Sequence, residues 1–372
     1  MLRNHKSSAL SLAVTMALTV ALGACTEGDG TGVDVEDVAF DAEASAADLQ
    51  VVQSAFSASM FEALNAASPN FNLVPGGAAP APGLIQAGWS AATSSTRWEA
   101  EAVARSLAES PALGTLLHDD LRGRTYDRDG GDYRHNDDRT DAPADGVRFI
   151  LYEVDPVTGE PGDTEIGYVD IIDESTDLAY VARVIVVTGG VEHINYTVSV
   201  GEGTESVRFE VVGFISDGTD RVDVDLSMSF VNEEGVSTAT VDQLIAVPSR
   251  DFEVDATTVA EFHHETEQGS ITVDAAFMQG VHTVTVSALI EFGEGDGDDG
   301  TDSGTVEIRV DGLLFAVVTV DGDTVTVQDA SGGELTAREA GAVRNIFDAL
   351  EDLFDDKFED FIRPVNWLFD RQ

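Results

Sequence analysis

Cysteine and lysine are almost absent from this chain of 372 residues. Its one cysteine, Cys25, excludes an intramolecular disulfide and any metal site built from several cysteines. Only 20 Lys and Arg residues stand against 69 Asp and Glu residues, which gives a formal net charge of −49. Because such a surface repels other polyanions, we expect neither nucleic acid nor an anionic lipid surface as a partner.

The common catalytic motifs are missing as well. The sequence has no Gly-x-Ser-x-Gly turn, no glycine-rich phosphate loop and no His-Glu-x-x-His helix, which removes the usual signatures of serine hydrolases, nucleotide-binding enzymes and zinc proteases. His263, His264 and Glu265 form the densest group of potential metal ligands. Neighbouring residues of a strand point to opposite faces, so this group is a poor chelate. We therefore expect no catalytic residues and no enzyme activity.

One continuous apolar run occurs, at residues 9–22, and it is shorter than the roughly 20 residues of a membrane-spanning helix. Arg3 and Lys6 precede this run, and the tetrapeptide Leu22-Gly23-Ala24-Cys25 ends it. The arrangement of charged start, short apolar run and small residues before a cysteine resembles the signal peptide of bacterial lipoproteins. The resemblance makes residues 1–24 a signal peptide and places the cleavage between Ala24 and Cys25.

The same resemblance implies that Cys25 carries lipid. In that family the thiol and the new N-terminal amine are both acylated, and several acyl chains at about 0.8 kcal/mol per buried methylene hold a protein stably in a membrane. The residue that follows the cysteine is Thr26 and not an aspartate. This resembles the sorting signal of lipoproteins that reside in the outer membrane, on its periplasmic or its surface face. Residues 25–42 are acidic and contain glycine, and are interpreted as a tether to the membrane.

Helical periodicity characterises the segment that follows, residues 43–118. Leu49, Val52, Phe56, Met60 and Leu64 recur at the spacing of one helix face. A second helix is expected from about residue 95 to a point before the proline at position 111. Both apolar stripes are interpreted as core.

From residue 119 to 333 the period changes to two. In Val222, Val224, Leu226, Met228 and Phe230 every second residue is apolar, as expected for a half-buried strand. Similar runs are separated by the turn signals Gly189-Gly190, Asp217-Gly218, Asp311-Gly312 and Asp321-Gly322-Asp323. We therefore predict a mainly β protein of the α+β class, in which about a dozen or more strands form an antiparallel meander. A meander of this length is expected to curl into a half-barrel or a barrel-like sheet.

The last segment, residues 334–372, is predicted to cover the apolar face of that sheet. Thr336 and Glu339 form a capping box, and an apolar stripe continues from Val343 to Ile362 until Pro364 ends the helix. Its opposite face is acidic, which makes packing on the sheet more favourable than contact with an anionic bilayer. Beyond the proline, the apolar cover is expected to be extended by Trp367, Leu368 and Phe369.

Calcium is the one cofactor that the sequence suggests. The acidic, glycine-rich loop at residues 294–302 offers Asp296, Asp298 and Asp302 as oxygen ligands, and a shorter loop runs from Asp127 to Asp132. Neither loop has the ligand spacing of an EF-hand. The alternative interpretation of both is a solvated acidic turn, in which case the protein has no cofactor.

Two functional hypotheses follow from these patterns. The first is a lipid-anchored lipoprotein of the cell envelope that acts as a non-catalytic binding or scaffold protein, with an envelope protein as its partner. The second is a carrier of a hydrophobic, lipid-like small molecule, held in a cavity between a half-barrel sheet and its covering helix. A hydrolase with an unrecognised site is a lesser alternative.

Overall fold

The structure is a computed structural model of the whole chain, and it describes residues 50–71, 116–129, 132–177, 179–202, 206–233, 235–266, 268–293, 303–322, 324–336, 340–341, 361, 363–365 and 368. Several sequence predictions fall outside these residues. They are the signal peptide with Cys25, the tether, the second helix, and the loop that contains Asp296, Asp298 and Asp302.

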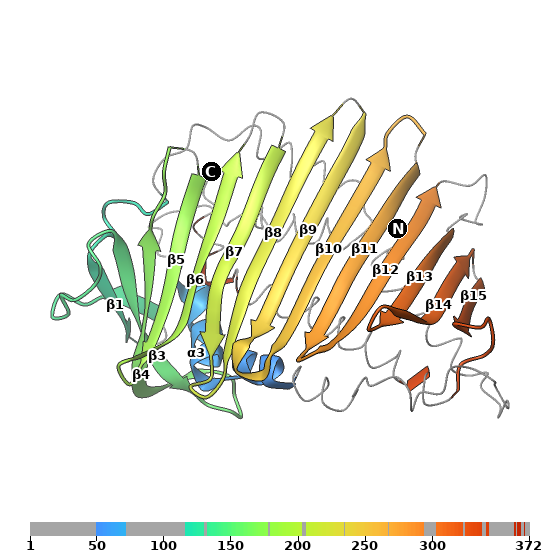
Figure 1. Cartoon of the computed structure of the whole chain (residues 1–372). Helices are drawn as coiled ribbons and strands as arrows, with labels where there is room; N and C mark the ends of the chain where they lie inside the picture. Colours follow the sequence, from blue (N-terminus) through green and yellow to red (C-terminus); the bar gives the residue numbers. More distant parts are fainter. Residues whose placement is uncertain are drawn as a thin grey trace. The chain divides into compact units, whose positions relative to one another are not determined.

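Fifteen strands form one sheet (Figure 1). They are β1 (Arg124–Asp129), β2 (Asp132–His135), β3 (Gly146–Val154), β4 (Pro161–Asp173), β5 (Ala179–Thr188), β6 (Val191–Glu202), β7 (Ser206–Ser216), β8 (Arg221–Glu233), β9 (Val236–Val247), β10 (Phe252–His263), β11 (Gln268–Gln279), β12 (His282–Gly293), β13 (Ser303–Val310), β14 (Leu313–Asp321) and β15 (Thr324–Asp329). The described part also contains the helix α3 (Ser59–Ala67) and two 3₁₀ turns, η2 (Ser68–Asn70) and η3 (Pro248–Arg250). The prediction of a mainly β protein is confirmed.

The predicted turns are confirmed too. Gly189-Gly190, Asp217-Gly218 and Asp311-Gly312 each lie between two consecutive strands, and Gly322 of the fourth signal directly follows the end of β14 at Asp321. Gly189 and Gly190 have positive φ angles, 59° and 80°, which fits the tight turn that joins antiparallel strands. Asp311-Gly312 also has two positive φ angles, 49° and 81°. Asp311 is one of two non-glycine residues with positive φ in the described part of the chain.

Two features of the predicted sheet need correction. The strand order runs from β15 to β3 and then to β1 and β2, so the sheet ends in two edge strands and is not closed into a barrel. The meander is also not antiparallel throughout, because β1 pairs in parallel with β3, through Arg124 opposite Val147 and Tyr126 opposite Phe149. The chain between β2 and β3, residues 136–145, passes β1 and places β3 on the side of β1 opposite to β2.

The chain divides into two compact units, which are described separately. The β1–β7 unit comprises Val51–Ser90, Trp98–Ser227 and Phe354–Gln372, and the β9–β15 unit comprises Met1–Gln50, Ala91–Arg97 and Met228–Leu353. The division falls within β8. All the contacts discussed below lie inside one unit or the other.

An aromatic core joins distant segments of the β1–β7 unit. Phe361 packs edge-to-face against Phe56, Phe61 and Tyr196, with ring centroids 5.1, 5.9 and 5.2 Å away. The Tyr196 hydroxyl donates a hydrogen bond of 2.7 Å to the carbonyl oxygen of Phe361. Burial raises the pKa of Tyr196 far above its ordinary value, so this hydroxyl stays protonated as a donor. The C-terminal segment is thus fixed to β6 at Phe361.

The structure describes part of each of the two segments that were predicted to contain the first helix and the C-terminal helix. Val52, Phe56, Met60 and Leu64 are buried, although a bend at residues 57–58 separates α3 from the helical residues 50–56. Among the C-terminal residues, Phe361, Val365 and Leu368 are buried. Pro364, which was predicted to end the helix, is itself helical. Residues 342–360 of the predicted covering helix lie outside the described residues.

Candidate functional site

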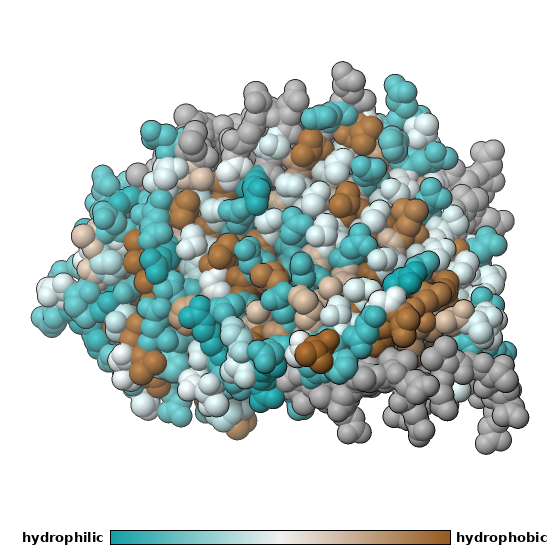
Figure 2. All heavy atoms as spheres, viewed as in Figure 1, coloured by the Kyte–Doolittle hydropathy of each residue, from teal (hydrophilic) through white to brown (hydrophobic). Residues whose placement is uncertain are grey.

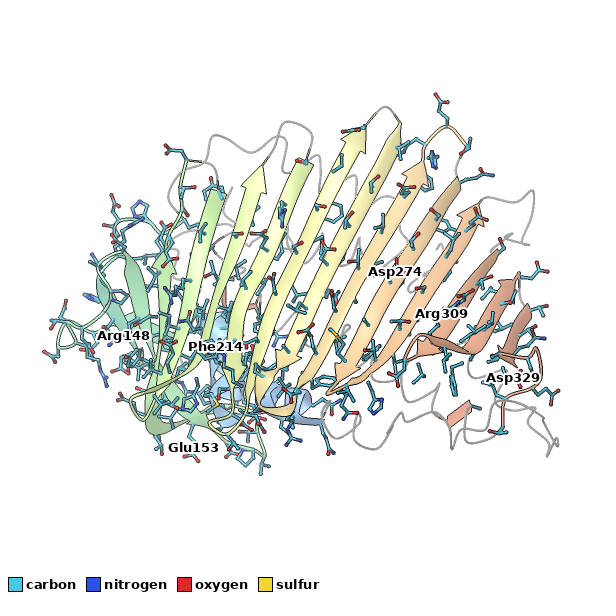
Figure 3. All side chains as sticks on the ribbon, in the orientation of Figure 1. Arg148, Glu153, Phe214, Asp274, Arg309 and Asp329 are labelled. Carbon is cyan, nitrogen blue, oxygen red and sulfur yellow. The ribbon has the colours of Figure 1, made fainter. Side chains whose placement is uncertain are left out.

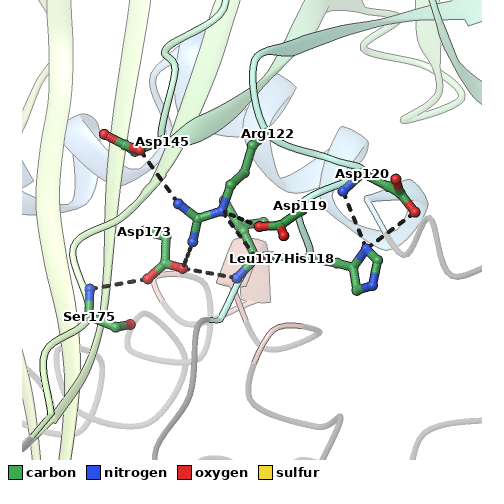
Figure 4. A network of polar contacts seen from close by, with 8 residues as sticks. All are labelled: Leu117, His118, Asp119, Asp120, Arg122, Asp145, Asp173 and Ser175. Atoms are coloured by element: carbon green, nitrogen blue, oxygen red, sulfur yellow. Dashed lines mark hydrogen bonds and ion pairs between the residues drawn. The ribbon is translucent and has the colours of Figure 1, made fainter.

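A network of charges links the residues before β1 to the strands of the β1–β7 unit (Figure 4). Arg122 forms an ion pair of 2.6 Å with Asp173, whose side chain is only 2 % exposed, and a longer one of 3.5 Å with Asp145. The same Asp173 carboxylate accepts hydrogen bonds of 3.1 Å from the backbone N–H groups of Leu117 and Ser175. Asp173 thus joins the residues before β1 to the end of β4.

A second ion pair joins β3 to β4. Arg148 and Asp170 stand directly opposite each other in the sheet, and the guanidinium donates two parallel hydrogen bonds of 2.7 Å to the carboxylate. A third bond of 2.5 Å reaches Asp141, and the Tyr168 ring lies 3.6 Å from the guanidinium carbon. Burial raises the pKa of Asp170, and the charge of Arg148 opposes that rise. Both partners are buried, so this pair is structural.

The third cluster surrounds Asp127 in β1. Its carboxylate accepts hydrogen bonds from the Tyr152 hydroxyl and, at 3.1 Å, from the Asn136 amide, and it pairs with Arg139 at 3.1 Å. Arg139 in turn donates two hydrogen bonds, of 3.1 and 2.7 Å, to Glu165. Protein donors therefore surround the first carboxylate of the Asp127–Asp132 loop, which leaves it a poor ligand for the calcium ion considered from the sequence.

These contacts change the pKa values of Asp127 and Tyr152. Partial burial by itself would raise the pKa of Asp127, but the hydrogen bonds from Tyr152 and Asn136 and the charge of Arg139 bring it below its ordinary value. Burial and the hydrogen bond to Asp127 raise the pKa of Tyr152 to about 12. At neutral pH Asp127 is charged and Tyr152 is protonated, which is the combination that their hydrogen bond requires.

Stability in acid should depend on Asp127. Its pKa is lower in the folded than in the unfolded chain, where it is near the ordinary value of about 3.9, so the carboxylate stabilises the fold above that pH. This contribution is lost as the pH falls through the folded pKa. We expect Asp127→Asn to lower stability at pH 7 and to flatten the dependence of stability on pH between about pH 5 and pH 2, measured by urea unfolding. The exposed Asp163→Asn variant is the control, and equal flattening in both variants would contradict the assignment.

His263 and His264, at the end of β10, have different surroundings. His263 is exposed and lies opposite Val236 and Gln268 in the sheet. His264 packs edge-to-face on Phe262, and its Nε2 atom lies 2.8 Å from the Ser237 hydroxyl. No group of three or more His, Cys, Asp or Glu residues is placed to hold a metal ion within the described ranges. The sequence pattern did not indicate the contacts of His264 with Ser237 and Phe262.

The exposed face of the β9–β15 unit shows an ordered arrangement of side chains, in three rows that cross the seven strands. From β9 to β15, the Glu291 row contains Thr238, Glu261, Ser270, Glu291, Ser303, Asp321 and Thr324. The Leu289 row beside it contains Thr240, Val259, Thr272, Leu289, Thr305, Thr319 and Thr326. The Asp274 row contains Asp242, Thr257, Asp274, Ser287, Glu307, Val317 and Gln328.

Acidic residues never stand directly opposite one another in these rows. In the Glu291 row they occupy β10, β12 and β14, and in the Asp274 row they occupy β9, β11 and β13. Serine or threonine separates successive acids within each row, and Thr257 donates a hydrogen bond of 2.9 Å to Asp242. Since like charges directly opposite destabilise a sheet, this alternation lets a very acidic chain form long paired strands.

The Leu289 row between the two acidic rows carries no charge. Figure 2 shows mostly hydrophilic residues on the face in view, with single hydrophobic residues among them and one larger hydrophobic group toward the lower right. Figure 3 labels Asp274 of β11 and Arg309 of β13. Arg309 lies two residues from Glu307 and pairs with it at 2.8 Å. Arg309 lies outside the three rows, and all members of the three rows are neutral or acidic. This face therefore combines an apolar and hydroxyl-bearing centre with two negative borders, and it is the best candidate for a binding surface.

Comparison with other proteins adds no family to this description. No protein-family model, curated protein or solved structure matches the chain. The candidate surface therefore depends on the geometry of the sheet alone. Among the described residues, no helix is long and apolar enough to cross a membrane.

Proposed function

We propose that the chain is a lipid-anchored lipoprotein of the bacterial cell envelope that binds a partner protein through the exposed face of β9–β15 and performs no catalysis. The observation that supports binding is the seven-strand face, on which the exposed Leu289 lies between two rows of regularly spaced acids. A solvent-facing side of a sheet needs only polar residues. Protein interfaces have an apolar centre and a polar rim, and the Leu289 row with its two acidic borders has the same order.

The proposed anchor is Cys25, followed by the tether of residues 25–42, and the proposed location is the outer membrane. The basic start, the apolar run and the sequence Leu22-Gly23-Ala24-Cys25 support this assignment. The charged networks of the β1–β7 unit support a non-catalytic role, because Asp127, Asp170 and Asp173 are each engaged by protein cations or donors.

The test measures lipid attachment and partner binding in the same cells. Cells that express the full chain with a photo-crosslinking amino acid at position 289 are labelled with an alkynyl palmitate analogue. We expect the protein to take up the label, fractionate with membranes and form a discrete crosslinked product. The Cys25→Ser variant should lose the label, leave the membrane fraction and lose the crosslink, because it no longer lies beside an envelope partner. A crosslinker at Val157, which is exposed in the β3–β4 turn, is the matched control position.

Three results would contradict the proposal. Palmitate labelling that persists in Cys25→Ser would remove the anchor. An apolar small molecule that co-purifies and is released by organic extraction would favour the carrier instead. Labelling of Ser237 by a fluorophosphonate would indicate a hydrolase, since its hydroxyl already contacts His264 at 2.8 Å.

A further inference from the structure

Leu289 is the most informative exposed side chain of the β9–β15 unit. It is 49 % exposed in the middle of β12, whereas Val281 and Leu313, the other large exposed aliphatic residues described in this unit, lie in a turn or at the first residue of a strand. Apolar residues at turns are common on soluble proteins and need no partner. Leu289 instead projects from the centre of the paired sheet, where it lies between the two acidic rows.

The spacing of the neighbouring acids limits the shape of what can bind there. Residues four apart along β12, such as Ser287 and Glu291, are about 14 Å apart, so the two acidic rows border a strip of that width. Acids on alternate strands, such as Glu261 and Glu291 or Asp274 and Glu307, are about 10 Å apart. An α-helix is about 10–12 Å wide with its side chains, and residues seven apart along it are separated by about 10.5 Å. Both dimensions fit a helix that lies across β10–β13.

The charges limit the partner's chemistry. Glu261, Glu291, Asp274 and Asp242 are exposed, and Arg309 pairs with Glu307 at 2.8 Å. A second copy of this chain carries 69 acidic against 20 basic residues and would be repelled, as would nucleic acid or an anionic lipid surface. Electrostatic complementarity therefore requires a cationic partner.

We propose that the Leu289 row and the acidic rows beside it bind a basic amphipathic helix of a partner protein. The apolar ridge of that helix contacts Leu289 and Val259, and its Arg or Lys residues, spaced seven apart on both flanks, face the Glu291 and Asp274 rows. This inference rests on the proposed function and names the class of partner that the face binds.

The test measures binding of a fluorescent 18-residue peptide to the full chain, purified in detergent, by fluorescence anisotropy. The peptide has leucines on one helical face and arginines seven apart on both flanks, and a scrambled peptide of the same composition is its control. We expect Leu289→Asp to weaken binding by about tenfold or more, because it removes one contact at the centre of the interface. Leu289→Thr should weaken binding less. Val281→Asp adds the same charge at an exposed turn residue and should leave affinity within about twofold.

The outcomes separate this inference from the proposed function. If Val281→Asp weakens binding as much as Leu289→Asp, or if the scrambled peptide binds as tightly, binding follows net charge alone and the inference is overturned. Leu289→Thr keeps the test valid if Leu289→Asp disturbs folding, because threonine already occupies the paired positions 272 and 305. A crosslink from position 289 to a partner without a basic helix would overturn the inference and leave the proposed binding face standing.

Discussion

Replacing Arg148 by alanine should lower the free energy of unfolding by about 3–5 kcal/mol, as expected when one partner of a buried ion pair is removed. The Asp170 carboxylate would remain buried beside a void, without the two hydrogen bonds of 2.7 Å that it now accepts. The Asp170 carboxylate would then either remain charged in a poorly hydrated environment or take up a proton, and both lower the stability of the fold. Urea unfolding followed by circular dichroism measures the loss.

The exposed pair of Arg134 and Asp129 is the matched control. Its atoms are 2.9 Å apart, but the side chains are 65 % and 69 % exposed, so Arg134→Ala should cost about 0–1 kcal/mol. The double variant Arg148→Met with Asp170→Leu should recover part of the loss, because it leaves no buried charge without a partner. Equal losses in Arg148→Ala and Arg134→Ala would mean that the buried pair contributes no more than a surface one.

Phe361→Ala is expected to destabilise the β1–β7 unit by about 3–5 kcal/mol, the range for removing a fully buried aromatic side chain. Phe361 is 1 % exposed and contacts the rings of Phe56, Phe61 and Tyr196. The cavity left behind would also disturb the segment whose carbonyl oxygen accepts the Tyr196 hydrogen bond. The measurement is again urea unfolding.

Two control variants provide stability losses with which that of Phe361→Ala can be compared. Tyr196→Phe keeps the ring and removes only the hydroxyl, so its loss should be about 0.5–1.5 kcal/mol. Val281→Ala changes a residue that is 89 % exposed and should have an effect within about 0.5 kcal/mol. A loss for Phe361→Ala no larger than that for Val281→Ala would show that the C-terminal segment does not contribute to this core.

The strands could be predicted because their signal is local. In β8, Val222, Val224, Leu226 and Met228 are all buried, as their period of two requires. The same holds for Val306, Ile308 and Val310 in β13. Each turn signal needs only two or three adjacent residues, so the meander followed from short stretches of sequence.

The features that depend on pairing could not be predicted in this way. Arg148 and Asp170 are 22 residues apart, and they meet because one particular register of β3 and β4 places them opposite each other. The parallel pairing of β1 with β3 similarly depends on the path of residues 136–145, which carry no periodic signal. The three rows of the exposed face depend on the registers of all six strand pairs from β9 to β15. The sequence alone shows that these strands contain acidic residues, but not that the acids alternate across the sheet.

The alternation of acids on that face has a consequence for how the strands find one another. Successive strands here are similar in length and pattern, so hydrophobic burial alone would accept a shift of two residues, which keeps every side chain on its own face. Shifting β9 or β11 by two residues in one direction against β10 would place Asp242 or Asp274 opposite Asp255. Such misalignments would oppose two negative charges and be disfavoured. The acidity of the chain thus helps to reject wrong strand alignments during folding.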